Sequence, residues 1–163
     1  YHEGVVKGDD FGRFNPDAKV SRAEAVKMVL EAAKFDLLAY DNLENCFGDV
    51  KTVGEHWFAA HVCGGKGAGY FKGNADGNFY PNAEVSKAEA LKMVLTAFDF
   101  EIKDNSKVMS VPYVDVNSED WFLGVAEAAN REGLIKPSEI FDGGRLLSRA
   151  EVAQVILNAM EKR

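Results

Sequence analysis

Apolar residues recur at helical spacing in three stretches of the chain, and each stretch opens with the same short motif. The stretches cover residues 22–34, 87–98 and 149–161, and the first of them carries Val26, Val29, Leu30 and Ala33. Apolar positions three and four residues apart predict amphipathic helices. The opening motif is apolar-Ser-x-Ala-Glu, and a Ser followed three residues later by Glu is a capping box. The pattern therefore predicts three capped helices, with Ser21, Ser86 and Ser148 as N-caps and Glu24, Glu89 and Glu151 as their partners.

The repetition extends beyond the helices, which makes the chain an array of one unit. Gly4-Val5-Val6-Lys7-Gly8 matches Gly69-Tyr70-Phe71-Lys72-Gly73, and Gly12-x-Phe14-x-Pro16 matches Gly77-x-Phe79-x-Pro81, both at the offset of 65 that separates Ser21 from Ser86. Phe47-Gly-Asp49-Val50 and Trp57-Phe58 match Tyr113-Val-Asp115-Val116 and Trp121-Phe122. A full unit thus reads Asp-Val, Trp-containing helix, Gly-apolar-apolar-Lys, loop and capped helix.

This unit resembles the S-layer homology (SLH) domain. The best stretch is Asp76-Gly77-Asn78-Phe79-Tyr80-Pro81-Asn82, which runs into Val85-Ser86-Lys87-Ala88-Glu89. The resemblance covers nearly the whole chain and implies an all-α fold, a pseudo-threefold array of helix-loop-helix repeats with short extended loop segments. We expect an incomplete unit, the second half only, at residues 1–40, and full units at 46–100 and 112–163.

The units depart from the pattern in three places. The first unit has no Asp-Val and no Trp helix, so we expect an upstream segment or another chain to complete it and to cover the apolar face of helix 22–34. The second Trp helix, Trp57 to Ala68, contains Gly64, Gly65 and Gly67 and should be short or frayed after Cys63. The loop of the third unit is two residues shorter and lacks the Pro and Asn before the cap, so a ligand site there is the least certain.

Composition narrows the possible partners. With 163 residues, 47% of them hydrophobic, the chain can bury a core, and no segment approaches the ~20 apolar residues of a membrane span. A net charge of −7 argues against nonspecific binding to nucleic acid or anionic lipid, and no membrane insertion is expected. Residue 1 is Tyr, which indicates a processed product or a trimmed piece. In an exported protein Cys46 and Cys63 would pair as a disulfide, and the alternative is two buried free thiols.

The first helical position after each cap is a cation, namely Arg22, Lys87 and Arg149. A cation there opposes the helix dipole by roughly 0.3–1 kcal/mol. One explanation is an anion site formed by free N–H groups at the helix start together with an exposed cation, and the other is that each cation extends into water or pairs with a neighbouring carboxylate. The SLH resemblance implies that these three residues contact acidic, typically ketal-pyruvylated, wall polysaccharide. The family also implies that Trp57 and Trp121 lie in or beside grooves between units, where an indole face can stack on a sugar, although a Trp at helical spacing is more often core.

The sequence argues against an enzyme and carries no cofactor or metal motif. His2, His56 and His61 show no zinc-protease spacing, and Asn74-Ala75-Asp76-Gly77-Asn78 lacks the Gly and Glu positions of an EF-hand and is a plain turn.

Two functions remain. The first is an extracellular, cell-wall or S-layer anchor that binds a secondary cell-wall polysaccharide or peptidoglycan-linked glycan. The second is a structural subunit that assembles with other chains into a surface layer or filament.

Overall fold

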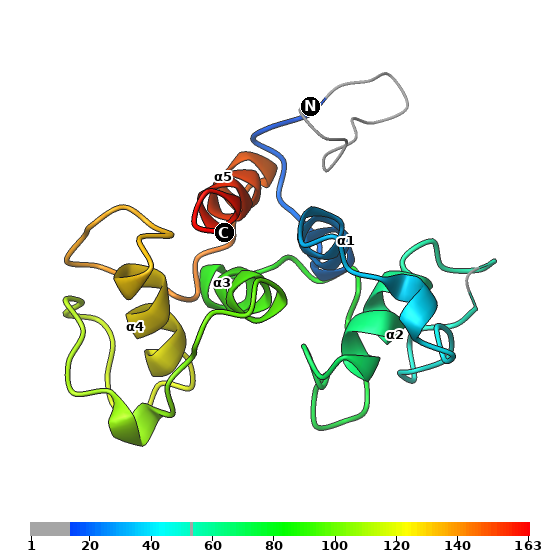
Figure 1. Cartoon of the computed structure of the whole chain (residues 1–163), viewed down its shortest axis with the longest axis horizontal. Helices are drawn as coiled ribbons and strands as arrows, with labels where there is room; N and C mark the ends of the chain where they lie inside the picture. The colour runs from blue at the N-terminus through cyan, green and yellow to red at the C-terminus, as the bar shows by residue number, and fades with distance from the viewer. Residues whose placement is uncertain (1–13, 53) are drawn as a thin grey trace.

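The computed structural model describes residues 14–52 and 54–163, and this part of the chain is helical (Figure 1). Its α-helices are α1 (Arg22–Ala32), α2 (Ala59–Gly67), α3 (Lys87–Ala97), α4 (Leu123–Arg131) and α5 (Arg149–Met160), with 3₁₀ turns η2 (Leu37–Ala39) and η3 (Asn105–Lys107). The described residues contain isolated backbone bridges and no β-strand. The all-α prediction is confirmed.

The three predicted capped helices are α1, α3 and α5, and each starts at the predicted residue. In every case the cap hydroxyl accepts from the backbone N–H three residues on, and the Glu carboxylate accepts from the N–H of the cap. The distances from these N–H nitrogens to the carboxylates of Glu24, Glu89 and Glu151 are 2.8, 2.9 and 2.9 Å. The helices end one or two residues before the predicted ends, which is the usual uncertainty at a helix terminus.

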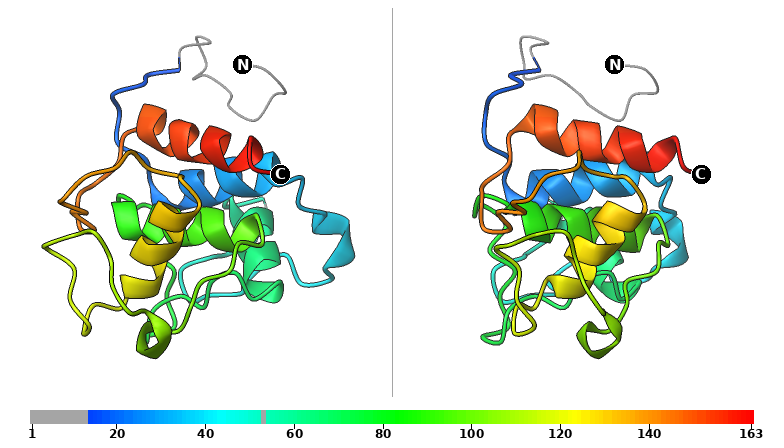
Figure 2. Two further views of the ribbon diagram at one scale, coloured as in Figure 1. Left: turned by 60° about the vertical axis from the view of Figure 1, so that its left-hand side comes forward. Right: turned by 90° about the vertical axis from the view of Figure 1, so that its left-hand side faces the viewer.

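These three helices lie side by side around one centre, with their N-terminal ends on the same side (Figures 1 and 2). Just before the caps, three backbone hydrogen bonds form a closed ring. The N–H of Val20 donates to the carbonyl of Leu147, that of Leu147 to Val85, and that of Val85 to Val20. All three residues are at most 2% exposed. The ring therefore joins the three units directly, and the pseudo-threefold array implied by the resemblance is present.

The expectation for helix 22–34 is wrong, because the described residues already cover that face. α2 packs against the outer side of α1, and α3 and α5 pack on its inner side (Figure 1). Val26 is fully buried and Leu30 is 2% exposed. The physical reason is the connectivity: a Trp-containing segment packs on the capped helix that precedes it in the chain, so α2 covers α1 and α4 covers α3.

The glycines of α2 do not fray it, contrary to expectation. The helix continues through Gly64 and Gly65 and ends at Gly67, so it is as long as α4. A Cβ added at Gly65 would lie 2.1 Å from the ring of Phe71, and one at Gly64 would lie 2.8 Å from the side chain of Leu37. The glycines let neighbouring side chains pack directly against the helix backbone, which offsets their low helix propensity.

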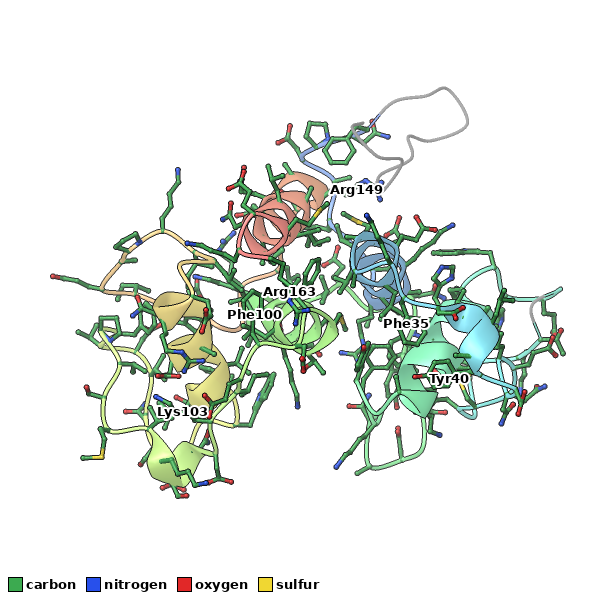
Figure 3. The ribbon with its side chains drawn as sticks, in the orientation of Figure 1. Phe35, Tyr40, Phe100, Lys103, Arg149 and Arg163 are labelled. Carbon is green, nitrogen blue, oxygen red and sulfur yellow. A yellow bond between two sulfur atoms is a disulfide. The ribbon has the colours of Figure 1, made fainter. Side chains whose placement is uncertain are left out.

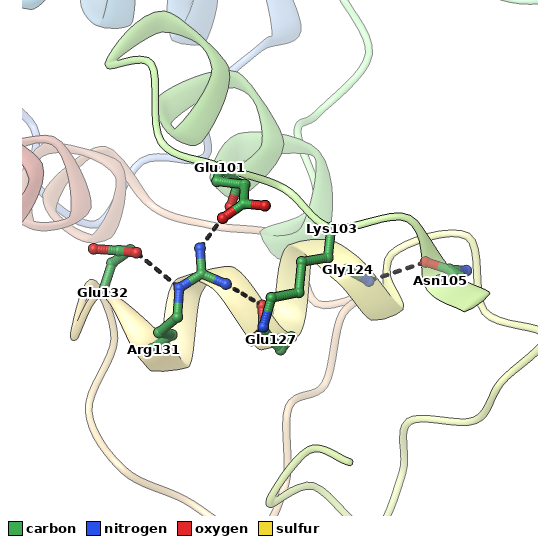
Figure 4. A network of polar contacts seen from close by, with 7 residues as sticks. All are labelled: Glu101, Lys103, Asn105, Gly124, Glu127, Arg131 and Glu132. Atoms are coloured by element: carbon green, nitrogen blue, oxygen red, sulfur yellow. Dashed lines mark hydrogen bonds and ion pairs between the residues drawn. The ribbon is translucent and has the colours of Figure 1, made fainter. Parts of the chain in front are cut away.

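The two outer helices, α2 and α4, are attached to the rest of the structure by different interactions. A disulfide joins Cys46 to Cys63 of α2, as the first of the two alternatives predicted. On α4, Glu127 pairs with Lys103 at 2.8 Å and with Arg131 at 2.5 Å. Arg131 also donates to the backbone carbonyl of Glu101, so an ion network ties α4 to the preceding segment (Figure 4).

We predict that Ser86→Ala lowers the free energy of unfolding by about 1 kcal/mol, because it removes the N-cap acceptor of α3. Equilibrium denaturation measures this. Ser86→Thr keeps a capping hydroxyl and should stay near the wild type. A loss equally large in Ser86→Thr would mean that the hydroxyl does not act as the cap.

Candidate functional site

The first backbone N–H groups of each central helix, α1, α3 and α5, donate to carbonyls in a loop of another unit. The first two helical N–H groups of α1 donate to the carbonyls of Ala83 and Pro81 at 2.8 and 3.0 Å. The same positions repeat twice, with α3 donating to Arg145 and Gly143 and α5 donating to Ala18 and Pro16. The idea of free N–H groups waiting for an anion is therefore wrong, because loop carbonyls and the cap hydroxyl already satisfy the first turn.

The two arginines in the first helical turns, Arg22 and Arg149, also contact residues of another unit at these helix starts. Arg22 donates to the carbonyl of Phe79 at 2.9 Å, lies over its ring, and pairs with Glu89. Arg149 donates to the carbonyl of Phe14 at 3.0 Å and pairs with Glu24 at 3.2 Å, which places it between α5 and α1 (Figure 3). Their side chains are only 12% and 15% exposed, whereas we expected exposed cations. Pairing with a neighbouring carboxylate, the second explanation, is what these two residues do.

Lys87 lies at the equivalent position of α3 and binds the loop of another unit in the same way, but it forms no ion pair with Glu151, which pairs with Arg145. Its ammonium donates to the carbonyl of Phe141 at 2.5 Å and lies 4.7 Å from the ring centroid. The carboxylate of Glu151 pairs instead with Arg145 at 2.6 Å. Burial lowers the pKa of Lys87, and the nearby charge of Arg145 lowers it further. This site therefore differs from the two arginine sites, as the single-point charge of Lys suggests.

Two grooves lie at equivalent positions of the second and third units. The first, called here the Arg22 groove, has a volume of about 580 Å³, and the second, the Lys87 groove, about 540 Å³. Each is lined by three cations and one carboxylate: Arg22, Lys72, Lys92 and Glu89 in the first, and Lys87, Lys136, Arg145 and Glu151 in the second. Each groove thus carries more positive than negative side chains, although the chain as a whole has a net charge of −7.

The two tryptophans are surface residues, so the core alternative is wrong. Trp57 and Trp121 lie two residues before α2 and α4 and are 53% and 54% exposed. Lys27 and Lys92 each lie 5.4 Å from the ring centroid of the nearby indole. Trp121 lines the Arg22 groove, whereas Trp57 lines a separate hollow with Asp49 and Tyr80.

Sequence reasoning missed four of the groove cations. Lys72 and Lys136 were visible as the Lys of the repeated Gly-apolar-apolar-Lys element. Lys92 recurs as Lys27 at the same helix position of α1, and the equivalent residue of α5 is Gln154. Arg145 had no such signal, because no equivalent cation stands in the other loops.

Two aspartates accept hydrogen bonds from the loops whose carbonyls bind the starts of α1 and α3. Asp49 accepts from the N–H groups of Phe79 and Tyr80 at 2.8 and 2.7 Å. Asp115 does the same for Phe141 and Asp142 at 2.8 and 2.7 Å. The third-unit loop thus reaches the same arrangement despite its shorter sequence.

The backbone of these loops is strained at one equivalent residue. Asn15, Tyr80 and Asp142, each just after the loop phenylalanine, have φ of 50°, 57° and 51°. Left-handed backbone is uncommon for a bulky residue such as Tyr80. The carboxylate bonds to Tyr80 and Asp142 help to hold this conformation.

The predicted plain turn at 74–78 is stabilised internally. Asp76 accepts from the N–H of Asn78 at 3.0 Å and from the hydroxyl of Tyr80. Over the described residues, no group of three His, Cys, Asp or Glu side chains is placed to hold a metal ion.

Comparison with known sequences identifies the repeats. The S-layer homology domain family matches residues 1–26 and 47–91, so these stretches carry SLH repeats, as the resemblance implied. It is 30% identical to the Surface-layer 125 kDa protein of Lysinibacillus sphaericus over 83% of the chain, and 24% identical to S-layer protein EA1 of Bacillus anthracis over 94%. An uncharacterized cell wall amidase of Bacillus anthracis is 35% identical over 65% of the chain.

The chain spans only 11%, 17% and 19% of these three relatives, in that order. The shared segment is therefore a module of larger proteins. The family and its relatives indicate a cell-surface anchoring module located at the cell wall or S-layer. None of the helices in the described part of the chain is long and apolar enough to cross a membrane.

We predict that Asp115→Ala lowers the free energy of unfolding by about 1 kcal/mol at pH 7, because two backbone N–H groups lose a charged acceptor that is itself exposed. The N–H of Phe141 lowers the pKa of Asp115 in the folded protein. A carboxyl with a lowered folded pKa stabilises the fold above its unfolded pKa, about 3.9, and loses that contribution as the pH falls through the folded pKa. The difference between wild type and variant should therefore shrink below about pH 4.

Urea denaturation at several pH values from 7 to 2.5 measures this difference. Glu119→Ala removes an exposed carboxylate at a nearby position and should leave the free energy of unfolding at pH 7 near that of the wild type. A difference between wild type and Asp115→Ala that stays constant down to pH 2.5 would contradict the assignment.

Proposed function

We propose that this chain is a non-catalytic module that binds acidic cell-wall polysaccharide, of the pyruvylated kind, and so anchors an exported protein to the wall. The observation that carries the proposal is the pair of grooves with three cations and one carboxylate each. In both grooves the carboxylate is already paired with an arginine of the protein. The exposed lysines of the two grooves, Lys72, Lys92 and Lys136, take no part in these two ion pairs and can meet an anion.

The ligand contacts divide into two kinds. Arg22 and Lys87 line the walls of the two grooves, and each is tied to a loop carbonyl of another unit, as Arg149 is at the start of α5. Lys72 and Lys92 are exposed and line the Arg22 groove, where they can meet a carboxylate. Trp121 stands at the same groove with half of its surface exposed and offers an indole face to a sugar ring. Trp57 would play this role in the hollow beside α2.

A second candidate function is assembly with other chains into a surface layer or filament, in which the grooves would bind a partner protein. Two of the relatives, named as surface-layer proteins, favour it. In that case the chain should self-associate or bind a protein partner without any glycan.

The test is binding of the 163-residue chain to purified wall polysaccharide, with and without its pyruvyl groups. Lys72→Gln with Lys92→Gln should weaken binding to the pyruvylated glycan about tenfold, because two exposed ion contacts contribute about 1.4 kcal/mol together. Gln already occupies the position of Lys92 in α5, so the fold should tolerate the change.

Lys107→Gln with Lys162→Gln changes the net charge equally, outside the grooves, and should bind as the wild type does. Isothermal titration calorimetry gives the affinities, and light scattering gives the assembly state. Equal affinity in the groove and control variants, or binding that ignores the pyruvyl groups, would overturn the proposal.

A further inference from the structure

A third hollow of the described surface differs in chemistry from the two basic grooves. It lies beside the start of α2 and has a volume of about 460 Å³, which is within the range of ligand pockets. No lysine or arginine is among the described residues that line it. The lining includes two carboxylates and several ring and amide side chains, namely Asp49, Glu55, His56, Trp57, Tyr80 and Asn82. The hollow is therefore acidic, the opposite of the Arg22 and Lys87 grooves.

Two half-exposed aromatic rings stand at this hollow. Trp57 is 53% exposed and Tyr80 is 45% exposed. The indole meets the ring of Phe58 edge to face, with the centroids 5.3 Å apart, and Phe58 is only 5% exposed. The hydroxyl of Tyr80 donates to the carboxylate of Asp76, and its N–H donates to Asp49 at 2.7 Å. Both rings are thus held at the surface, where they can contact a ligand.

The tyrosine is particular to the second unit. In the third unit the residues equivalent to Tyr80 and Ala83 are Asp142 and Arg145. The loop of the first unit has Asn15 at the position of Tyr80. All three residues have left-handed backbone, which suits Asn and Asp better than a bulky Tyr. Local structure does not account for the tyrosine, whereas a contact made by its exposed ring would.

The polar groups of the hollow can still bind a donor. Each carboxylate oxygen of Asp49 accepts one backbone N–H, and such an oxygen can accept more than one hydrogen bond. The carboxylate of Glu55 is exposed. Carboxylates beside aromatic rings favour a positively charged group. Because the carboxylates also accept hydrogen bonds, a primary ammonium suits the hollow better than a quaternary one.

We propose that this hollow binds a sugar ring that carries a free ammonium group, that is, a hexosamine without its N-acetyl group. Glu55 and Asp49 pair with the ammonium, and the rings of Trp57 and Tyr80 contact the sugar. The sugar in this inference rests on the proposed function, in which the chain binds wall glycan. The ammonium rests on the charge of the hollow itself.

The test is an NMR titration of the isotope-labelled chain with a glucosamine tetramer and with its fully N-acetylated counterpart. The chain has two tryptophans, so their indole N–H signals report separately on the hollow and on the Arg22 groove. Trp57→Phe assigns the signals. The glucosamine tetramer should shift the signal of Trp57 and leave that of Trp121 in place. Its affinity should exceed that of the N-acetylated tetramer about tenfold, because only the free amine is charged.

Two variants of the hollow and one control locate the binding. Glu55→Gln removes a negative charge at nearly constant shape and should weaken binding of the glucosamine tetramer about fivefold. Tyr80→Asn should have a similar effect, and it places at this left-handed position the residue type that the first unit has. Glu119→Gln, at the equivalent exposed position of the third unit, is the matched control and should bind as the wild type does.

The proposed function and this inference can fail separately. Lys72→Gln with Lys92→Gln, the variant that tests the Arg22 groove, should leave the shift of Trp57 intact. A chain that binds pyruvylated glycan but shows no Trp57 shift with glucosamine would keep the proposed function and overturn the ammonium site.

Three further outcomes would overturn the ammonium site. The first is equal affinity for the two tetramers. The second is equal affinity in Glu55→Gln and Glu119→Gln, which would mean nonspecific attraction to an acidic chain. The third is a Trp57 shift as large with Nα-acetyl-lysine amide as with glucosamine, which would assign the hollow to a lysine side chain of a partner protein.

Discussion

The backbone hydrogen bonds at the starts of the central helices are the constraint on which the rest of the structure depends. Helix N-termini expose N–H groups that must find acceptors. Here the acceptors are carbonyls of a loop from another unit, at Ala83 for α1, Arg145 for α3 and Ala18 for α5. No unit can complete its own helix start, so the three units are stable as a set.

This constraint also changes the role of the basic motif residues. Arg22 and Arg149 bind a loop carbonyl and a carboxylate across the junction, and their aliphatic stems and guanidinium groups are largely buried. A ligand can reach only part of each side chain. In the proposed function, recognition at the Arg22 groove therefore depends on the exposed lysines that line it, Lys72 and Lys92.

The sequence predicted what local chemistry determines. The three helix starts were correct, because a capping box involves residues only three apart. The disulfide and the repeat order were also within reach. The sequence did not predict which outer helix covers each central helix. α2, which packs on α1, lies nearly 30 residues away, and whether a capped helix packs on the Trp segment before it or after it depends on tertiary contacts. The glycines of α2 were misjudged for the same reason: propensity counts the cost of Gly65, and only the fold reveals the ring of Phe71 against it.

The two outer helices are held by different chemistry, and they should therefore be vulnerable to different surroundings. α2 is tied by the covalent bond between Cys46 and Cys63, which ionic strength does not affect and a reductant can break. α4 is tied by Lys103, Glu127 and Arg131, whose partly exposed charges are screened by salt and indifferent to redox state. High salt would therefore weaken the attachment of α4, and a reducing, thiol-rich medium would weaken the attachment of α2. A single environmental stress would thus leave one of the two outer helices fastened.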